Sequence, residues 1–382
     1  MRKSRLDDIS YYPSLRVSVS SLLPYSYVGV EHLVKDRGGV CLSPDMPNAD
    51  SAIQFRPGDI LLGNIRPYLK KIWLADITGG ASGDVIVVRI RDEYKDSITP
   101  DYLYKVLSSD QFFAYDNLNT KGAKMPRGDK KSIAAYLIPI PSIGEQKSIV
   151  DELDLLTSII DKKNAQLRDL DAMAQSIFYE MFGDPISNEK KWALSTIDQV
   201  CKSIIRGPFG SALKKEFFVQ PGESTYKVYE QKHAIQKSAS IGSYYIDNER
   251  FLSLSRFSVE PGDIIMSCSG TIGELFTIPA NSERGIINQA LLLFRLNSSI
   301  EHTYFLFVME ALKSSLDTKG AGIQNIGSVK FIKSMAFAFP DLSLQRAFSE
   351  KIRRLEKMKL EIESSLKETT DLYNCRMDMY FN

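Results

Sequence analysis

The sequence has few of the residues that build metal centres and disulfide frameworks. Among its 382 residues are three histidines and four cysteines, Cys41, Cys201, Cys268 and Cys375. The cysteines lie far apart without a C-x-x-C pair, whereas zinc sites and disulfide scaffolds need clustered spacing. We therefore expect reduced, structural thiols in a cytoplasmic protein that binds no metal.

Long apolar runs and an excess of one charge are also absent. No run approaches the ~18 residues of a membrane span, and no apolar signal region follows the charged start. Lys and Arg number 48 and Asp and Glu 47, which gives a formal net charge of +1. This balance argues against a general polycation, because proteins that hold phosphates alone are often strongly basic. The near-zero net charge is compatible with a DNA-binding protein whose positive charge is local, or whose partners contribute to DNA binding.

Catalytic motifs are missing as well. The sequence contains no G-x-x-x-x-G-K-S/T phosphate loop, no G-x-G-x-x-G and no Asn/Asp-Pro-Pro-aromatic motif of amino-methyltransferases. Glu145-Gln146-Lys147 and Glu230-Gln231-Lys232 match only the last part of a metal-dependent nuclease motif, and the former also fits a helix cap. We expect no catalytic site, no cofactor and no enzymatic activity in the chain itself.

The main positive feature is an internal repeat. The segment Pro141–Phe182 recurs 199 residues later as Pro340–Phe381, without a gap. Shorter fragments upstream recur in the same order at slightly different separations: Pro57-Gly58-Asp59-Ile60 with Pro261-Gly262-Asp263-Ile264, and Thr120-Lys121-Gly122-Ala123 with Thr318-Lys319-Gly320-Ala321. Each half therefore consists of a region that differs between the two copies, followed by a region in which the copies align without a gap.

The regions with kept spacing read as long helices. Apolar residues recur in alternating steps of four and three from Ile149 to Met181 and from Phe348 to Tyr380, which is a heptad pattern. Lys163 and Lys359 lie on this seam, where we expect them to set the helix register. Two such rods in one chain most simply pack against each other, and the sequence alone leaves open whether they run parallel or antiparallel.

Local signals mark the ends of the first helix. Ser142 and Glu145 have the spacing of a capping box, and Gly183 and Pro185 follow the last periodic residue. The variable regions instead read as mixed α and β. We expect strands at 84–90 and 289–296, further strands after each Pro-Gly-Asp turn, and helices near 101–107 and 302–312. Each half is thus expected to be a β-rich α+β domain followed by a helix.

Two unlike globular regions, each followed by a long helix that opens with Pro-x-x-x-x-Gln, resemble the specificity subunits of type I restriction-modification systems. The resemblance covers the whole chain. Its most specific pieces are Ile140–Gln146, the following helix to Phe182-Gly183-Asp184-Pro185, Lys121-Gly122, Lys319-Gly320, Trp192-Ala193-Leu194 and Arg206-Gly207-Pro208-Phe209-Gly210-Ser211. The chain departs from this pattern at Leu344, which replaces the capping glutamate, and the first half has no clear copy of the Arg206–Ser211 loop.

The resemblance implies two target recognition domains in tandem, at residues 1–140 and 184–339. Each is followed by a conserved helical spacer, at 141–183 and 340–382, and the two helices pack as an antiparallel coiled coil. It further implies a non-catalytic subunit that recognises a bipartite double-stranded DNA target with an unread gap. Its implied partners are two methyltransferase subunits and two motor-nuclease subunits.

Loops that carry glycine beside Arg, Lys, Ser or Asn are the best candidates for DNA contact. Glycine lets the backbone approach a phosphate, and arginine can bind guanine through two hydrogen bonds. The candidates in the first half are Asn64, Arg66, Lys121, Lys124, Arg127, Lys130 and Lys131. Those in the second half are Arg206, Ser211, Lys214, Lys215, Ser267, Ser269, Thr271, Lys319, Gln324 and Asn325. For any single residue, an ordinary solvated loop is the alternative interpretation.

Two other functions are compatible with parts of this pattern. One is a non-enzymatic coiled-coil scaffold whose globular halves bind proteins, and strong salt dependence of DNA binding would exclude it. The other is the recognition tail of a single-chain restriction enzyme, against which the two-repeat layout argues.

Overall fold

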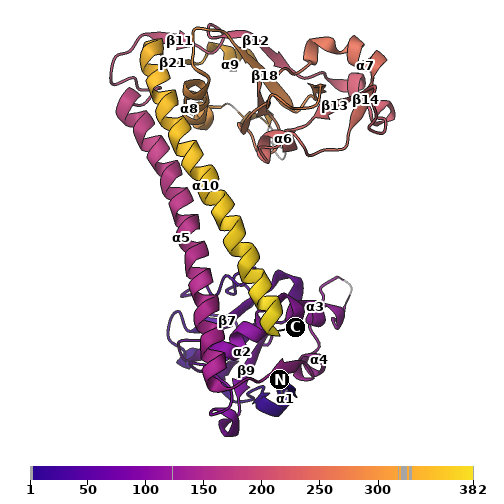
Figure 1. Ribbon diagram of the computed structural model, residues 1–382, viewed down its shortest axis with the longest axis vertical. Coiled ribbons are helices and arrows are strands. Elements are labelled where there is room, and N and C mark those ends of the chain that lie inside the picture. Colours follow the sequence, from indigo (N-terminus) through magenta and orange to yellow (C-terminus); the bar gives the residue numbers. More distant parts are fainter. Residues whose placement is uncertain (1–2, 123, 317, 320–324, 327–328, 382) are drawn as a thin grey trace. The chain divides into compact units, whose positions relative to one another are not determined.

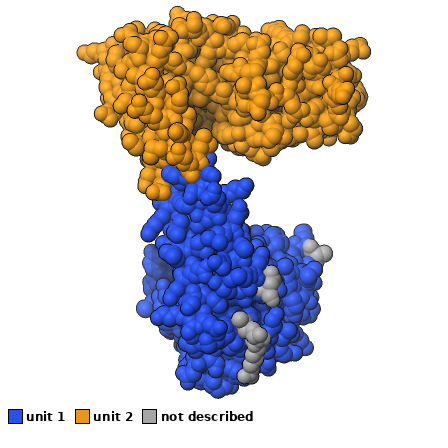
Figure 2. All heavy atoms as spheres, in the orientation of Figure 1, with its two compact units in different colours: residues 1–165, 362–382 blue, residues 166–361 orange. Residues whose placement is uncertain are grey.

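The computed structural model describes residues 3–122, 124–316, 318–319, 325–326 and 329–381. It contains two compact units, residues 1–165 with 362–382 and residues 166–361 (Figure 2). Two long helices, α5 (Ile143–Phe182) and α10 (Leu342–Phe381), contribute to both units. Because both helices are shared in this way, the domain limits expected from the sequence stay a prediction.

The first unit is built on two four-stranded sheets, and Figure 1 labels strands β7 and β9 of one of them. One has the order β2-β9-β6-β7 and comprises Ser10–Tyr11, Val85–Ile90, Ile60–Gly63 and Ile72–Leu74. The other has the order β3-β5-β8-β4 and comprises Arg16–Ser18, Ser51–Phe55, Gly79–Ala81 and Tyr27–Val28. The remaining regular elements are β1 (Lys3–Arg5), α1 (Leu6–Ile9), α2 (Pro100–Leu107), α3 (Asp110–Leu118), α4 (Lys130–Ala134) and β10 (Leu137–Pro139).

The second unit repeats this plan. Its four-stranded sheet has the order β12-β18-β15-β16 and comprises Cys201–Arg206, Leu291–Leu296, Ile264–Ser267 and Leu275–Thr277. A three-stranded sheet has the order β14-β13-β17 and comprises Tyr245–Asp247, Thr225–Tyr229 and Gly285–Ile287. The remaining elements are β11 (Leu194–Thr196), α6 (Gln231–Ile235), α7 (Asn248–Ser253), α8 (His302–Leu312), β19 (Thr318–Lys319), β20 (Asn325–Ile326), α9 (Val329–Ser334) and β21 (Ala336–Ala338).

The Pro-Gly-Asp match upstream of the helices marks structurally equivalent turns in the two units. In the first unit, Asp59 of the Pro-Gly-Asp turn accepts two hydrogen bonds from Arg89, at 2.8 and 2.6 Å. In the second unit, Asp263 accepts the same pair from Arg295, at 2.9 and 2.7 Å. Each carboxylate also caps its own turn, so one ion pair ties the turn to the central strand in both repeats.

The two glutamines of the Pro-x-x-x-x-Gln signal join each long helix to the globular region before it. Gln146 donates to the Pro141 carbonyl oxygen at 3.0 Å and accepts from the Thr99 backbone N–H at 3.0 Å. Gln345 donates to the Pro340 carbonyl oxygen at 2.8 Å, and its side-chain oxygen accepts from a backbone N–H just before α8. Both side chains are fully buried, so the motif fixes where each helix leaves its domain.

The long helices pair within each unit, and in each they run in opposite directions. In the first unit, Glu152 of α5 meets Tyr380 of α10, and Lys163, further along α5, reaches Thr369, which lies earlier in α10. In the second unit, Asp171 of α5 pairs with Lys359, while Phe178, further along α5, packs on Phe348, which lies earlier in α10. The predicted α+β class with two long antiparallel helices is confirmed. Among the described residues, no helix is long and apolar enough to cross a membrane.

Candidate nucleic-acid interface

Three loops of the first unit converge at one end of its central sheet. The β6–β7 loop contains Arg66, whose backbone N–H donates to the Pro126 carbonyl oxygen at 2.7 Å. The second loop is the one that contains Pro126. The third contains Asp36, whose backbone N–H donates to the Leu69 carbonyl oxygen at 2.8 Å, and Arg37, whose N–H donates to the Lys70 carbonyl oxygen at 2.9 Å. Residues 124–131, which include four of the individually predicted cations, therefore lie beside the candidates Asn64 and Arg66.

The backbone of these loops adopts an unusual conformation. Arg66 and Lys70, which flank the short turn Pro67–Leu69, have φ values of 54° and 50°. Asp36 and Arg37 in the neighbouring loop have φ values of 56° and 63°. Residues other than glycine rarely occupy this left-handed region, and such strain concentrates at functional sites. The hydrogen bonds between the loops hold all four residues in place.

The predicted cations of this surface are exposed but differ in their partners. Lys121 pairs with Asp129 at 3.1 Å, and Arg127 pairs with Asp84 at 3.0 Å. The remaining predicted cations here are also exposed, and their side chains form no ion pair with any residue that the structure describes: Arg66, Lys124, Lys130 and Lys131. Positive charge is thus concentrated locally although the chain as a whole is nearly neutral.

Two further cations belong to this surface and were not predicted from the sequence. Arg37 and Lys70 both pair with Asp110 at the first position of α3, Lys70 at 2.6 Å. Arg37 precedes Gly38 and Gly39, so the criterion of glycine beside a cation could have identified it. Lys70 has no neighbouring glycine and carried no such signal.

A buried polar cluster lies beneath the basic segment. Asn64 Oδ1 and Asp116 Oδ1 are buried, and neither has a hydrogen-bond partner among the described residues. A Cβ on Gly128 would lie 2.6 Å from the Asp116 oxygen and 3.1 Å from the Asn64 oxygen. Burial raises the pKa of Asp116 to about 6. Asn64 therefore turns its carbonyl oxygen inward, and Gly128 is needed for the close approach of the segment.

The equivalent loop of the second unit, between β15 and β16, has different chemistry. Gly270 and Gly273 supply its positive φ values, 65° and 84°. Ser267 is fully buried, and its hydroxyl bonds within the turn, to the Thr271 carbonyl oxygen at 2.5 Å. Thr271 is exposed and Ser269 is half-buried, so these two hydroxyl-bearing side chains are the ones available on the loop.

The other predicted residues of the second unit are spread over several elements. Arg206 ends β12, donates to the Gln289 carbonyl oxygen at 2.8 Å and lies over the Phe209 ring. Lys214 and Lys215 are exposed; Lys214 lies between two short 3-10 turns, of which the first contains Ser211 and the second begins at Lys215. Lys319 and Asn325 face each other in the β19–β20 ladder, and Gln324 lies outside the described residues. The structure thus does not gather these residues as closely as those of the first unit.

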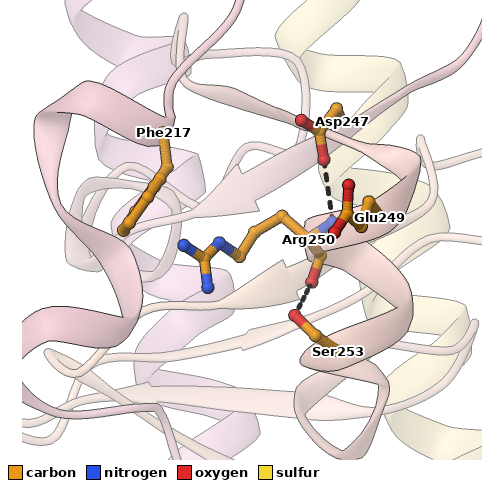
Figure 3. A pocket seen from close by; sticks show the side chains of 5 residues that line it. All are labelled: Phe217, Asp247, Glu249, Arg250 and Ser253. Carbon is orange, nitrogen blue, oxygen red and sulfur yellow. Dashed lines mark hydrogen bonds between the residues drawn. The ribbon is translucent and has the colours of Figure 1, made fainter.

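A cavity of about 330 Å³ in the second unit was not foreseen (Figure 3). The Arg250 guanidinium stacks on Phe217 at 3.6 Å, and Asp247 caps the short helix α7 by accepting from the Arg250 backbone N–H. Nothing in the sequence signalled this cation–π pair, because its partners are 33 positions apart in chain numbering.

The described residues offer no arrangement for metal chemistry, since they contain no group of three or more His, Cys, Asp or Glu suited to hold an ion. Burial raises the pKa of the Cys201 and Cys268 thiols to about 12, which suits structural rather than reactive cysteines. The exposed, locally basic loops are instead suited to hydrogen bonding with an anionic polymer.

Comparisons of sequence find similar proteins. Residues 189–370 match the type I restriction modification DNA specificity domain. The chain is 22% identical over 371 residues to the type I restriction enzyme MjaVIII specificity subunit of Methanocaldococcus jannaschii, covering 90% of this chain and 82% of the relative. It is also 24% identical over 133 residues to the EcoDI specificity subunit of Escherichia coli, covering 34% of this chain and 29% of that relative.

Solved structures share the fold. A chain from a type I R-M system, studied for complex assembly and conformational transition, matches with a TM-score of 0.66 at 20% identity, covering 100% of this chain and 97% of the other. The type I restriction-modification S subunit from M. genitalium matches with a TM-score of 0.54 at 13% identity, covering 100% and 96%. Together with the repeated architecture, these findings show that the chain is similar in sequence and in fold to the specificity subunits of type I restriction-modification systems.

Proposed function

We propose that this chain recognises a bipartite double-stranded DNA target, with one half-site read by each globular region and an unread gap between them. The observation that carries the proposal is the pair of equivalent loops, β6–β7 and β15–β16, on the same sheet of the two repeats. Exposed loops on a rigid sheet are the usual place for recognition residues.

The two loops support different half-sites because their side chains differ. The first presents Arg66 and Tyr68, of which the tyrosine is 52% exposed. The second presents Ser269 and Thr271, one on each side of Gly270. Arginine favours guanine, whereas serine and threonine hydroxyls form hydrogen bonds with several bases. We therefore expect the two half-sites to differ in sequence.

The chain is a non-catalytic subunit, and it works with DNA and with the methyltransferase and restriction subunits of its system. We propose two copies of each partner, because the chain itself is a two-fold repeat with two equivalent helix starts at Gln146 and Gln345. A net charge of +1 supports DNA binding by several subunits together, in which the partners supply part of the contact with the phosphate backbone.

Salt dependence of DNA binding tests the proposal. The full chain, purified with its methyltransferase subunits, is titrated with duplexes drawn from the host genome at several salt concentrations. We expect binding that weakens steeply as salt rises, since release of counterions accompanies phosphate contact. Matched complexes that lack the chain serve as the control. If the chain adds neither affinity nor sequence preference, the protein-binding scaffold is the correct function.

A further inference from the structure

We propose that Arg66 is the residue with which the first globular region reads a guanine, and that the surrounding loops exist to hold it in position. The inference rests on the proposed function and names a specificity-determining residue within it. It is drawn from the backbone geometry, the hydrogen bonding and the charge distribution of the three converging loops.

The turn that carries Arg66 is preorganised. It closes on itself, because the Leu69 N–H donates to the Arg66 carbonyl oxygen at 2.9 Å. Pro67 within this turn is buried, and Lys71 Nζ, which follows the turn, donates to the Val30 carbonyl oxygen at 2.6 Å. Together with the contacts to residues 36, 37 and 126, these bonds fix the turn from three sides. A rigid turn loses little conformational freedom when DNA binds, so discrimination between bases is preserved.

The guanidinium of Arg66 differs from the other guanidinium groups of this surface in its partners. The other arginines of this surface are engaged, Arg37 by Asp110 and Arg127 by Asp84. The Arg66 side chain is exposed, and among the described residues it forms no hydrogen bond or ion pair. Its five N–H donors are therefore available in a fixed fork, the geometry that matches O6 and N7 of guanine.

The exposed lysines near Arg66 suit phosphate binding better than base recognition. Lys124, Lys130 and Lys131 are also exposed, but they are flexible point charges on the neighbouring segment and its helix. Such residues suit the phosphate backbone, which carries no sequence information. Arg66 differs from them because its backbone is braced in the left-handed region on a separate loop.

The test is selection from randomised duplexes by the full chain in complex with its methyltransferase subunits. The variants are Arg66→Gly, which removes the guanidinium and accepts the positive φ without strain, and Arg66→Lys, which keeps the charge. The control is Arg56→Ala, an exposed arginine at the opposite end of strand β6. Melting temperatures establish that each variant is folded.

We expect the wild-type complex to require a guanine at one position of one half-site. Arg66→Gly should reduce discrimination at that position roughly ten- to a hundred-fold and leave the other half-site unchanged. Arg66→Lys should lose discrimination there while it keeps its affinity for unselected duplex, and Arg56→Ala should behave as wild type. Unchanged discrimination in both Arg66 variants, or an equal loss of affinity for every sequence, overturns the inference. A wild-type complex that selects no sequence overturns the proposed function and the inference with it.

Discussion

At the scale of single residues, the buried glutamines show how one side chain can connect two elements. Gln146 bonds to three backbone groups, those of Ser97, Thr99 and Pro141, and has no exposed surface. Removal of the side chain leaves these groups unpaired in the interior, where each costs ~1–3 kcal/mol.

We expect Gln146→Ala to lower the free energy of unfolding by about 2–4 kcal/mol, measured by urea denaturation of the full chain. Gln166→Ala, at an exposed position of the same helix, is the matched control and should change stability by less than about 0.5 kcal/mol. Equal stability of the two variants would mean that the motif does not anchor the helix.

The buried carboxyl of Asp116 makes stability depend on pH. Its pKa is raised by burial to about 6, above the ordinary value of ~3.9 in an unfolded chain. The folded state therefore holds this proton more tightly, and stability is lost as pH rises from about 4 to about 6. Asp116→Asn should be more stable than wild type at pH 8, by about 1–3 kcal/mol, and the difference should shrink toward pH 4.

Denaturation curves of Asp116→Asn and wild type at several pH values check this expectation, with Asp169→Asn on an exposed helix position as the control. A difference between Asp116→Asn and wild type that is constant across this range would show that the carboxyl is ionised throughout in the folded chain.

The sequence indicates which residue types lie in the candidate loops, but not which way their side chains face. Ser267 and Ser269 met the same criterion, yet the hydroxyl of Ser267 bonds inside the turn and that of Ser269 lies nearer the surface. Which side a serine faces depends on where the strand β15 ends, and its pattern of buried residues does not alternate. The pairing of Lys70 with Asp110 could not be predicted from the sequence either, because it depends on the approach of the β6–β7 loop to the start of α3.

At the scale of elements, the long helices and the main strands were predictable and the approach of the loops was not. Heptad spacing and the signals at Ser142 and Gly183 predicted α5, whose capping box is present in the structure. The strand expected at 289–296 is β18, Leu291–Leu296. No local signal indicates that residues 36–37, 66–70 and 126–127 meet, because each contact joins segments with little pattern of their own.

Gly128 tests the role of this meeting point. In Gly128→Ala the new methyl group would collide with Asp116, so the segment 121–131 should move away from the β6–β7 loop. We expect DNA affinity to fall about tenfold or more, equivalent to ~1.4 kcal/mol, in duplex titrations with the assembled complex. Gly83→Ala, where a Cβ meets no atom within 4 Å, should bind as wild type. Equal affinities would place the functional surface elsewhere.

At the scale of the whole molecule, the helices α5 and α10 are expected to act as a ruler between the half-sites. Four residues inserted after Leu167 add about 6 Å of helix, and DNA rises ~3.4 Å per base pair. The unread gap should therefore grow by about one or two base pairs while both half-sites stay the same. A three-residue insertion should be tolerated less well, because it turns the seam of Leu170, Ala174 and Ile177 further from its partner.

Selection from randomised duplexes by the two insertion variants measures the gap directly. An active four-residue variant with an unchanged gap would mean that the globular regions, and not the helices, fix the spacing.

The central claim is that this chain alone decides where its system modifies DNA. The most direct measurement is long-read mapping of methylated bases in cells that carry the methyltransferase subunit with and without this chain. The account predicts a single motif of two short half-sites separated by a fixed, unread gap, modified only when the chain is present. The same modified sites in both cells, or one continuous motif, would contradict it.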